Sequence, residues 1–120
     1  MPDLVPAKIF GPMSQCRAGS DIPLICSTFG FKKTLEVVYV HLFKDGIEVD
    51  EKLQLEEQHD TVFTLTRVST KQNGNYSCMF SKNNSLSSEI KRKGDNLIGI
   101  TVIGKNLLYH FIFTTYYLLN

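Results

Sequence analysis

Hydrophobic and polar residues alternate along several short stretches of the chain, and this period of two predicts β-strands. The clearest alternation falls within residues 37–43. One face of this stretch carries Val38, Val40 and Leu42, and the other carries Val37, Tyr39, His41 and Phe43. Side chains alternate across a strand, so one of these faces can pack on a core while the other carries an aromatic surface.

Turn formers divide the rest of the chain into further strands. We expect strands within residues 4–10, 22–26, 63–65, 75–80 and 97–102, a short segment within 13–18, and one or two charged strands within 47–60. Pro6, within residues 4–10, places that strand at a sheet edge, because proline cannot donate to a central ladder. Asp45-Gly46 favours a hairpin turn. The pattern predicts an all-β chain.

A cluster of turn formers at residues 71–74 is followed by Tyr76-Ser77-Cys78, and a second cysteine, Cys26, lies upstream. This arrangement resembles the corner between strands E and F of an immunoglobulin-like domain, and residues 42–46 are similar to the strand C motif of that family. The resemblance covers most of residues 4–104. It implies an antiparallel two-sheet sandwich of C2/I-like or short V-like type, a corner tyrosine at Tyr76, and an inter-sheet disulfide between Cys26 and Cys78.

Two residues depart from the family pattern. Leu42 stands where a buried tryptophan is expected, and Gln72 stands where an aspartate commonly closes the corner. The missing tryptophan removes a large apolar side chain beside the disulfide. We therefore expect aliphatic side chains to repack around Leu42.

The length and composition suit one domain. The chain has 120 residues, of which 42% are hydrophobic, enough for a single core. We assign residues 1–104 to the immunoglobulin-like domain and residues 105–120 to an apolar tail outside the fold. The apolar part of the tail, 107–119, has 13 residues and contains His110, so it is too short to span a membrane. An interfacial segment, a truncated span and a non-native tail remain open, and membrane attachment is expected only through segments absent from this sequence.

Charge and residue inventory argue against several functions. The net charge is +1, so no global field favours nucleic acid. The three histidines have no spacing that pairs one with a nucleophile or a metal, and there is no glycine-rich phosphate loop. Residues 56–60 form an acidic run that resembles a solvated edge more than a cation loop. We expect no enzyme, no cofactor and no metal.

Three cysteines in a small β chain suit an oxidising compartment. Cys16 is then unpaired. We favour a half-buried apolar role for it, and an intermolecular disulfide is the alternative. Residues 1–6 do not form a signal peptide, so the chain begins at a mature end or is cytosolic, and the disulfide pattern favours the first.

Two glycosylation sequons, at Asn75 and Asn83, suit an extracellular domain. Asn83 lies in an expected turn, where the same residues also serve as turn formers, and that alternative stays open.

The resemblance implies that this chain is itself a recognition domain, similar to innate immune receptor, Fc-receptor-like or secreted immune-type domains. The expected function is an extracellular module that binds a protein partner through the outer face of strands C and F. The predicted contact residues are Tyr39, His41, Phe43, Met79 and Ser81. Exposed aromatic clusters often mark partner sites. The alternative is that the segment after Lys91, or the tail, covers this face.

Two other functions remain open: homophilic adhesion, including a disulfide-linked dimer, and an intracellular structural immunoglobulin domain with reduced cysteines.

Overall fold

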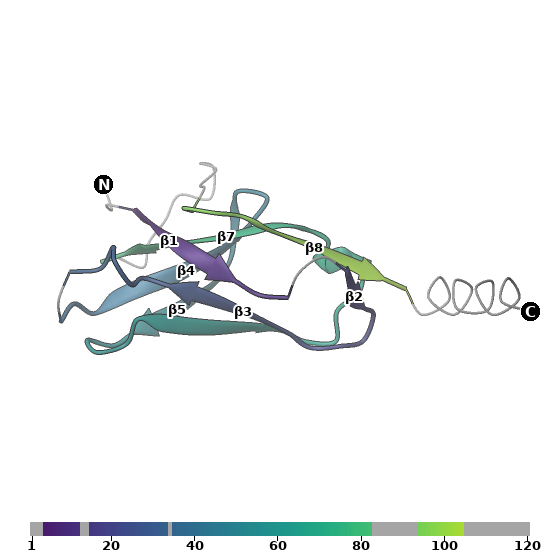
Figure 1. Cartoon of the computed structure of the whole chain (residues 1–120), viewed down its shortest axis with the longest axis horizontal. Coiled ribbons are helices and arrows are strands. Elements are labelled where there is room, and N and C mark those ends of the chain that lie inside the picture. The colour runs from purple at the N-terminus through teal and green to yellow at the C-terminus, as the bar shows by residue number, and fades with distance from the viewer. Residues whose placement is uncertain (1–3, 13–14, 34, 83–93, 105–120) are drawn as a thin grey trace, which may run out of the picture.

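The structure is a computed structural model that describes residues 4–12, 15–33, 35–82 and 94–104. These residues form eight strands and one short 3-10 helix (Figure 1). The elements are β1 (Val5–Phe10), β2 (Gln15–Arg17), β3 (Ile22–Ser27), β4 (Val38–Lys44), β5 (Ile47–Gln54), β6 (Asp60–Leu65), η1 (Thr70–Gln72), β7 (Gly74–Ser81) and β8 (Ile98–Ile103). The predicted all-β fold is confirmed.

The strands form the two layers of a sandwich. In one layer β4 lies between β5 and β7, and β8 pairs with the first part of β7. In the other layer β3 lies between β1 and β6. All of these pairs are antiparallel. The short strand β2 runs parallel to β8, beside which it lies in Figure 1.

Strand β1 belongs to both layers. Its first half, Val5 to Ala7, pairs with β7, and its second half, Lys8 to Phe10, pairs with β3. Each half lies at the edge of its layer, as Pro6 predicted. Where β1 passes between layers, the Asn96 side chain accepts a hydrogen bond from the Ile9 amide at 2.8 Å and donates one to the Ile9 carbonyl at 2.9 Å. Asn96 thus satisfies backbone groups that no strand pairs at this point.

A disulfide and a shared core hold the layers together. Cys26 of β3 is bonded to Cys78 of β7, with a Cα–Cα distance of 5.8 Å, which confirms the implied pairing. A loop of this length contributes about 4 kcal/mol by restricting the unfolded chain. The core around it includes Leu24, Val38, Val40, Leu42, Phe63, Tyr76 and Ile100. The predicted inward face of strand β4 is confirmed.

The corner before β7 is closed by residues 69–76. Ser69 and Gln72 form a capping box: the Gln72 side chain accepts from the Ser69 amide at 2.7 Å. The Tyr76 hydroxyl donates to the Gln72 carbonyl at 2.7 Å, as expected of a corner tyrosine. Burial raises the pKa of Tyr76, and the nearby Asp45 carboxylate adds to that rise. Gln72 therefore closes the corner in place of the usual aspartate.

A partly open cavity of about 210 Å³ lies beside Leu42, where the tryptophan of the family is missing. Its apolar lining comes from Leu42, Val49, Phe63, Leu65 and Tyr76, and its polar lining from Lys44, Asp50, Thr64 and Gln72. Leu42 is fully buried and lies opposite Cys78 in the β4–β7 pair. The expected aliphatic packing is present, but it does not fill this side of the sandwich.

The charged segment after the hairpin forms a single strand, β5, and the chain then turns at residues 55–58. The hairpin turn itself is as predicted, because Asp45 and Gly46 both have positive φ, at 52° and 84°. The tail, residues 105–120, lies outside the described residues. Within the described residues, no helix has the length and apolar character needed to cross a membrane.

Candidate functional site

The outer face of β4 and β7 is largely covered, which corrects the predicted exposed surface. His41, Phe43, Met79 and Ser81 are buried, and Tyr39 alone of the predicted contact residues is partly exposed. Alternation identifies the face on which a side chain lies, but not what covers that face.

Long side chains from β5 account for part of this burial. The carboxyl groups of Glu48 and Glu51 lie against the His41 ring, and the Phe43 ring lies 6.4 Å from the ring of His41 between centroids. The alternative expectation is that the segment after Lys91 covers this face, and Lys91 lies outside the described residues. The described Gly94 packs against the backbone of Cys78 and Ala7.

A β-bulge brings the two glutamates to the same side of β5. The register of β4 and β5 shifts between Leu42 and Phe43, so His41 lies opposite Glu51 whereas Phe43 lies opposite Glu48. In a regular strand, residues three positions apart point to opposite faces. The extra residue of the bulge removes that alternation and turns Glu48 and Glu51 toward His41.

His41, Glu48 and Glu51 form a compact polar cluster on this face. His41 Nδ1 lies 2.5 Å from Glu48 Oε1 and 3.5 Å from Glu51 Oε1. On the other side of the ring, Nε2 lies 2.8 Å from Ser81 Oγ. The imidazole is fully buried, while the glutamate side chains are 30% and 31% exposed. Sequence reasoning missed this cluster because no glycine marks the bulge.

An apolar patch lies at the end of β4 and β5, next to the cluster. Its members are Val37, Tyr39, Leu53 and Leu55, which we call the outer apolar patch. Tyr39 and Leu53 are direct cross-strand partners. Leu53 is 51% exposed and Leu55 is 55% exposed. Adjacent exposed apolar side chains on a small domain are typical of a contact surface.

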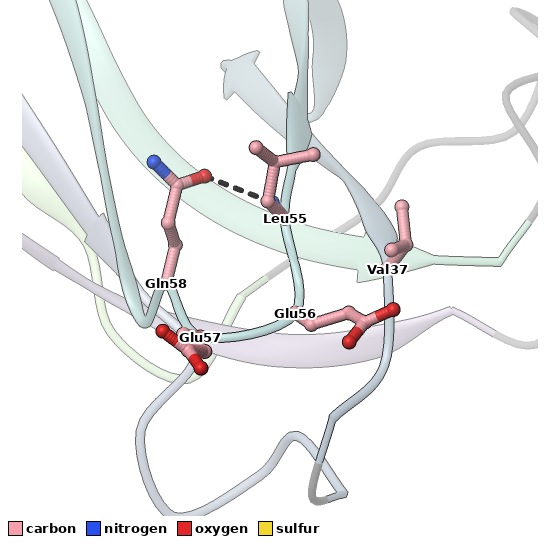
Figure 2. Close-up of a pocket in the computed structure, with 5 residues that line it drawn as sticks. All are labelled: Val37, Leu55, Glu56, Glu57 and Gln58. Carbon is pink, nitrogen blue, oxygen red and sulfur yellow. Dashed lines mark hydrogen bonds between the residues drawn. The ribbon is translucent and has the colours of Figure 1, made fainter.

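A pocket extends the outer apolar patch into the turn after β5. It has a volume of about 450 Å³ and is lined by Val37, Leu55, Glu56, Glu57 and Gln58. Figure 2 shows the Glu56 side chain extended toward Val37, with the Gln58 side chain bonded to the Leu55 amide. The pocket therefore combines an apolar wall with carboxylates.

Lys32 supports this turn. Its ammonium group donates to the carbonyl oxygens of Leu55 at 2.9 Å and Gln58 at 3.0 Å. Desolvation lowers the pKa of Lys32, and the negative charges of Glu36 and Glu56 partly oppose that effect. These hydrogen bonds hold the backbone of the turn that lines the pocket in one conformation.

The remaining predicted residues lie apart from this site. Cys16 is a free, half-buried thiol in β2 that packs against the core, in agreement with its favoured apolar role. Asn75 is exposed at the start of β7, and its sequon stays a prediction. Asn83 lies outside the described residues.

The chain belongs to the immunoglobulin domain family, whose family model matches residues 12–89. This family and fold are non-enzymatic. A search of the curated proteins finds no match.

Solved structures similar to this chain are immune receptor domains. One is the extracellular domain of mouse leukocyte-associated immunoglobulin-like receptor 1, described as a strand-swapped dimer. It is 25% identical, with a TM-score of 0.58 over 76% of this chain and 87% of that one. A second structure of the Ig-like domain of that receptor, also a strand-swapped dimer, is 26% identical, with a TM-score of 0.60 over 77% and 90%. CHIR-AB1, at 16% identity and a TM-score of 0.57 over 86% and 100%, shares the fold. The disulfide-bonded domain is consistent with an extracellular location.

Proposed function

We propose that this chain is an extracellular recognition domain of the immune system that binds a protein partner through the outer apolar patch. The observation that carries the proposal is the pair formed by the partly exposed Tyr39 and the exposed Leu53 on the sheet of β5, β4, β7 and β8. Aromatic and aliphatic side chains that meet on a rigid sheet supply contact area at low entropic cost. The likeness to an immune receptor extracellular domain supports the same role.

The charges around the outer apolar patch favour a particular kind of partner. Glu51 lies beside Leu53 on the same strand, and Glu56 and Glu57 line the adjoining pocket. Complementary charges steer association and suppress wrong partners. The partner surface therefore presents an apolar side chain flanked by lysine or arginine.

The predicted contact residues take two roles in this proposal. Tyr39 contacts the partner. His41, Phe43, Met79 and Ser81 are buried on the same face of the sheet, beside the contact surface, and support it.

Binding of fluorescent tetramers of the domain to leukocyte panels tests the proposal. Leu53→Ser is expected to reduce staining at least tenfold without changing the unfolding midpoint. Val62→Ser is the matched control, because Val62 is 45% exposed on β6 of the other layer. Equal staining by Leu53→Ser and the unsubstituted domain contradicts the proposed contact surface.

The extracellular assignment has its own test, which also separates it from the intracellular structural alternative. Protein exported by a secretory route is expected to carry one alkylatable thiol, from Cys16, and glycan mass at a sequon. Three alkylatable thiols in protein from its native source contradict export.

A second candidate function is homodimerisation by exchange of β1. The division of β1 between two layers, followed by Gly11 and Pro12, favours it, and the similar receptor domains are described as strand-swapped dimers. Exchange of an identical element is a low-cost route to a dimer.

A cysteine trap tests the exchange. Lys8 and Ser27 are cross-strand partners, so Lys8→Cys with Ser27→Cys, in a Cys16→Ser background, links them covalently. Exchange is expected to give a dimer on a non-reducing gel. A linked monomer contradicts it.

A further inference from the structure

We propose that His41, Glu48 and Glu51 bind a divalent transition-metal ion with the chemistry of zinc. Their nearest nitrogen and oxygen atoms all lie within 4.8 Å of one another. Zinc binds histidine nitrogen and carboxylate oxygen at about 2.0–2.2 Å, so three donors around one ion span such distances. This site does not depend on the proposed partner surface, although the two adjoin.

The surroundings of the ring favour metal ligation through Nδ1. Nε2 lies 2.8 Å from Ser81 Oγ, so an Nε2–H that donates to this hydroxyl leaves the Nδ1 lone pair facing the two carboxylates. Histidines that bind metals generally donate their other ring N–H in this way, which fixes the tautomer and the ring orientation. The buried ring is therefore already oriented for ligation.

With the proton on Nε2, the ring offers no donor to the two carboxylates. In the tautomer above, Nδ1 and the carboxylates are all acceptors, and the gap between Nδ1 and Glu48 is only 2.5 Å. Glu51 Oε1 is itself buried without a hydrogen-bond partner. A buried acceptor left unsatisfied is costly. A divalent ion between the three groups satisfies all of them at once.

The donor set selects among metal ions. Calcium takes six to eight oxygen ligands, whereas this cluster offers one imidazole nitrogen and two carboxylates. Zinc accepts such mixed ligands and commonly leaves a fourth position open. Because Glu48 and Glu51 are each about a third exposed, the fourth position faces solvent. Glu48 needs a shift of less than about 1 Å to admit the ion between its oxygen and Nδ1, which its flexible side chain permits.

Calorimetric titration of the full chain with zinc chloride, in a Cys16→Ser background, tests the site. One ion per chain is expected. Glu51→Gln and Glu48→Gln are each expected to weaken binding at least tenfold, because each replaces a charged ligand with a neutral amide of the same shape. Glu57→Gln is the matched control, since Glu57 is exposed in the turn after β5. Unchanged affinity in Glu51→Gln, or no binding at millimolar zinc, overturns the proposal.

A second readout covers the case in which a glutamate variant does not fold. In the ¹⁵N NMR spectrum of the unsubstituted chain, zinc is expected to shift the Nδ1 resonance of His41 and to leave His59 unchanged. A shift confined to His59 or His110 overturns the assignment of the site.

Discussion

The hydroxyl of Tyr76 donates to the carbonyl oxygen of Gln72, and the side chain of Gln72 in turn accepts from the Ser69 amide. Gln72 therefore stabilises the corner through hydrogen bonds of both its backbone carbonyl and its side chain. Tyr76→Phe is expected to lower the free energy of unfolding by about 1 kcal/mol, because the Gln72 carbonyl loses its buried donor. Urea denaturation measures this. Tyr39→Phe, on the outer face, is the control, and an equal loss in both variants contradicts a special role for the corner.

The ionisation of Tyr76 couples stability to alkaline pH. Burial, with the Asp45 charge second, raises its pKa in the folded state above the ordinary value of 10.0. Below pH 10 both folded and unfolded tyrosine are protonated, so stability is complete there. Above that value the unfolded chain ionises first, and stability falls as pH rises toward the folded pKa. Urea midpoints between pH 9 and pH 11 are expected to decline more steeply for the unsubstituted chain than for Tyr76→Phe. Parallel declines contradict the coupling.

The cavity beside Leu42 predicts a stabilising substitution. Leu42→Trp places the large ring usual for the family into the space of about 210 Å³ and is expected to raise the free energy of unfolding by about 1 kcal/mol. Val40→Trp, two positions along the same face and outside the cavity lining, is expected to destabilise the domain. Thermal unfolding distinguishes them. Lower midpoints for both variants mean that the cavity is too narrow for the ring.

Gly94, which precedes β8, packs closely against the backbone of Cys78 and Ala7. A Cβ atom added at this position would contact the Cys78 carbonyl oxygen and would lie 2.9 Å from the Cys78 nitrogen and 3.1 Å from the Ala7 oxygen. Gly94→Ala is therefore expected to cost about 1–3 kcal/mol, because the segment must move away from β7. Gly104→Ala, where nothing lies within 4 Å of the added atom, is expected to be neutral in the same denaturation measurement. Similar costs in both variants contradict the contact.

Much of the fold follows from local pattern. Alternation located β4 and its inward face, and the Tyr76-Ser77-Cys78 motif identified the family and hence the disulfide to Cys26. The outer face was predicted wrongly because Phe43 and Met79 are buried by groups whose positions depend on tertiary structure. The bulge that turns Glu48 and Glu51 toward His41 has no glycine to signal it, and strand parity alone places residues 48 and 51 on opposite faces.

The division of β1 between two layers has a mechanical consequence. A pulling force at the N-terminus first meets the pairs between Val5–Ala7 and β7, and only then those between Lys8–Phe10 and β3. The first three residues can detach while the next three still hold the second layer. A domain tethered through this end therefore yields in two steps, and the Cys26–Cys78 bond keeps the layers joined after both.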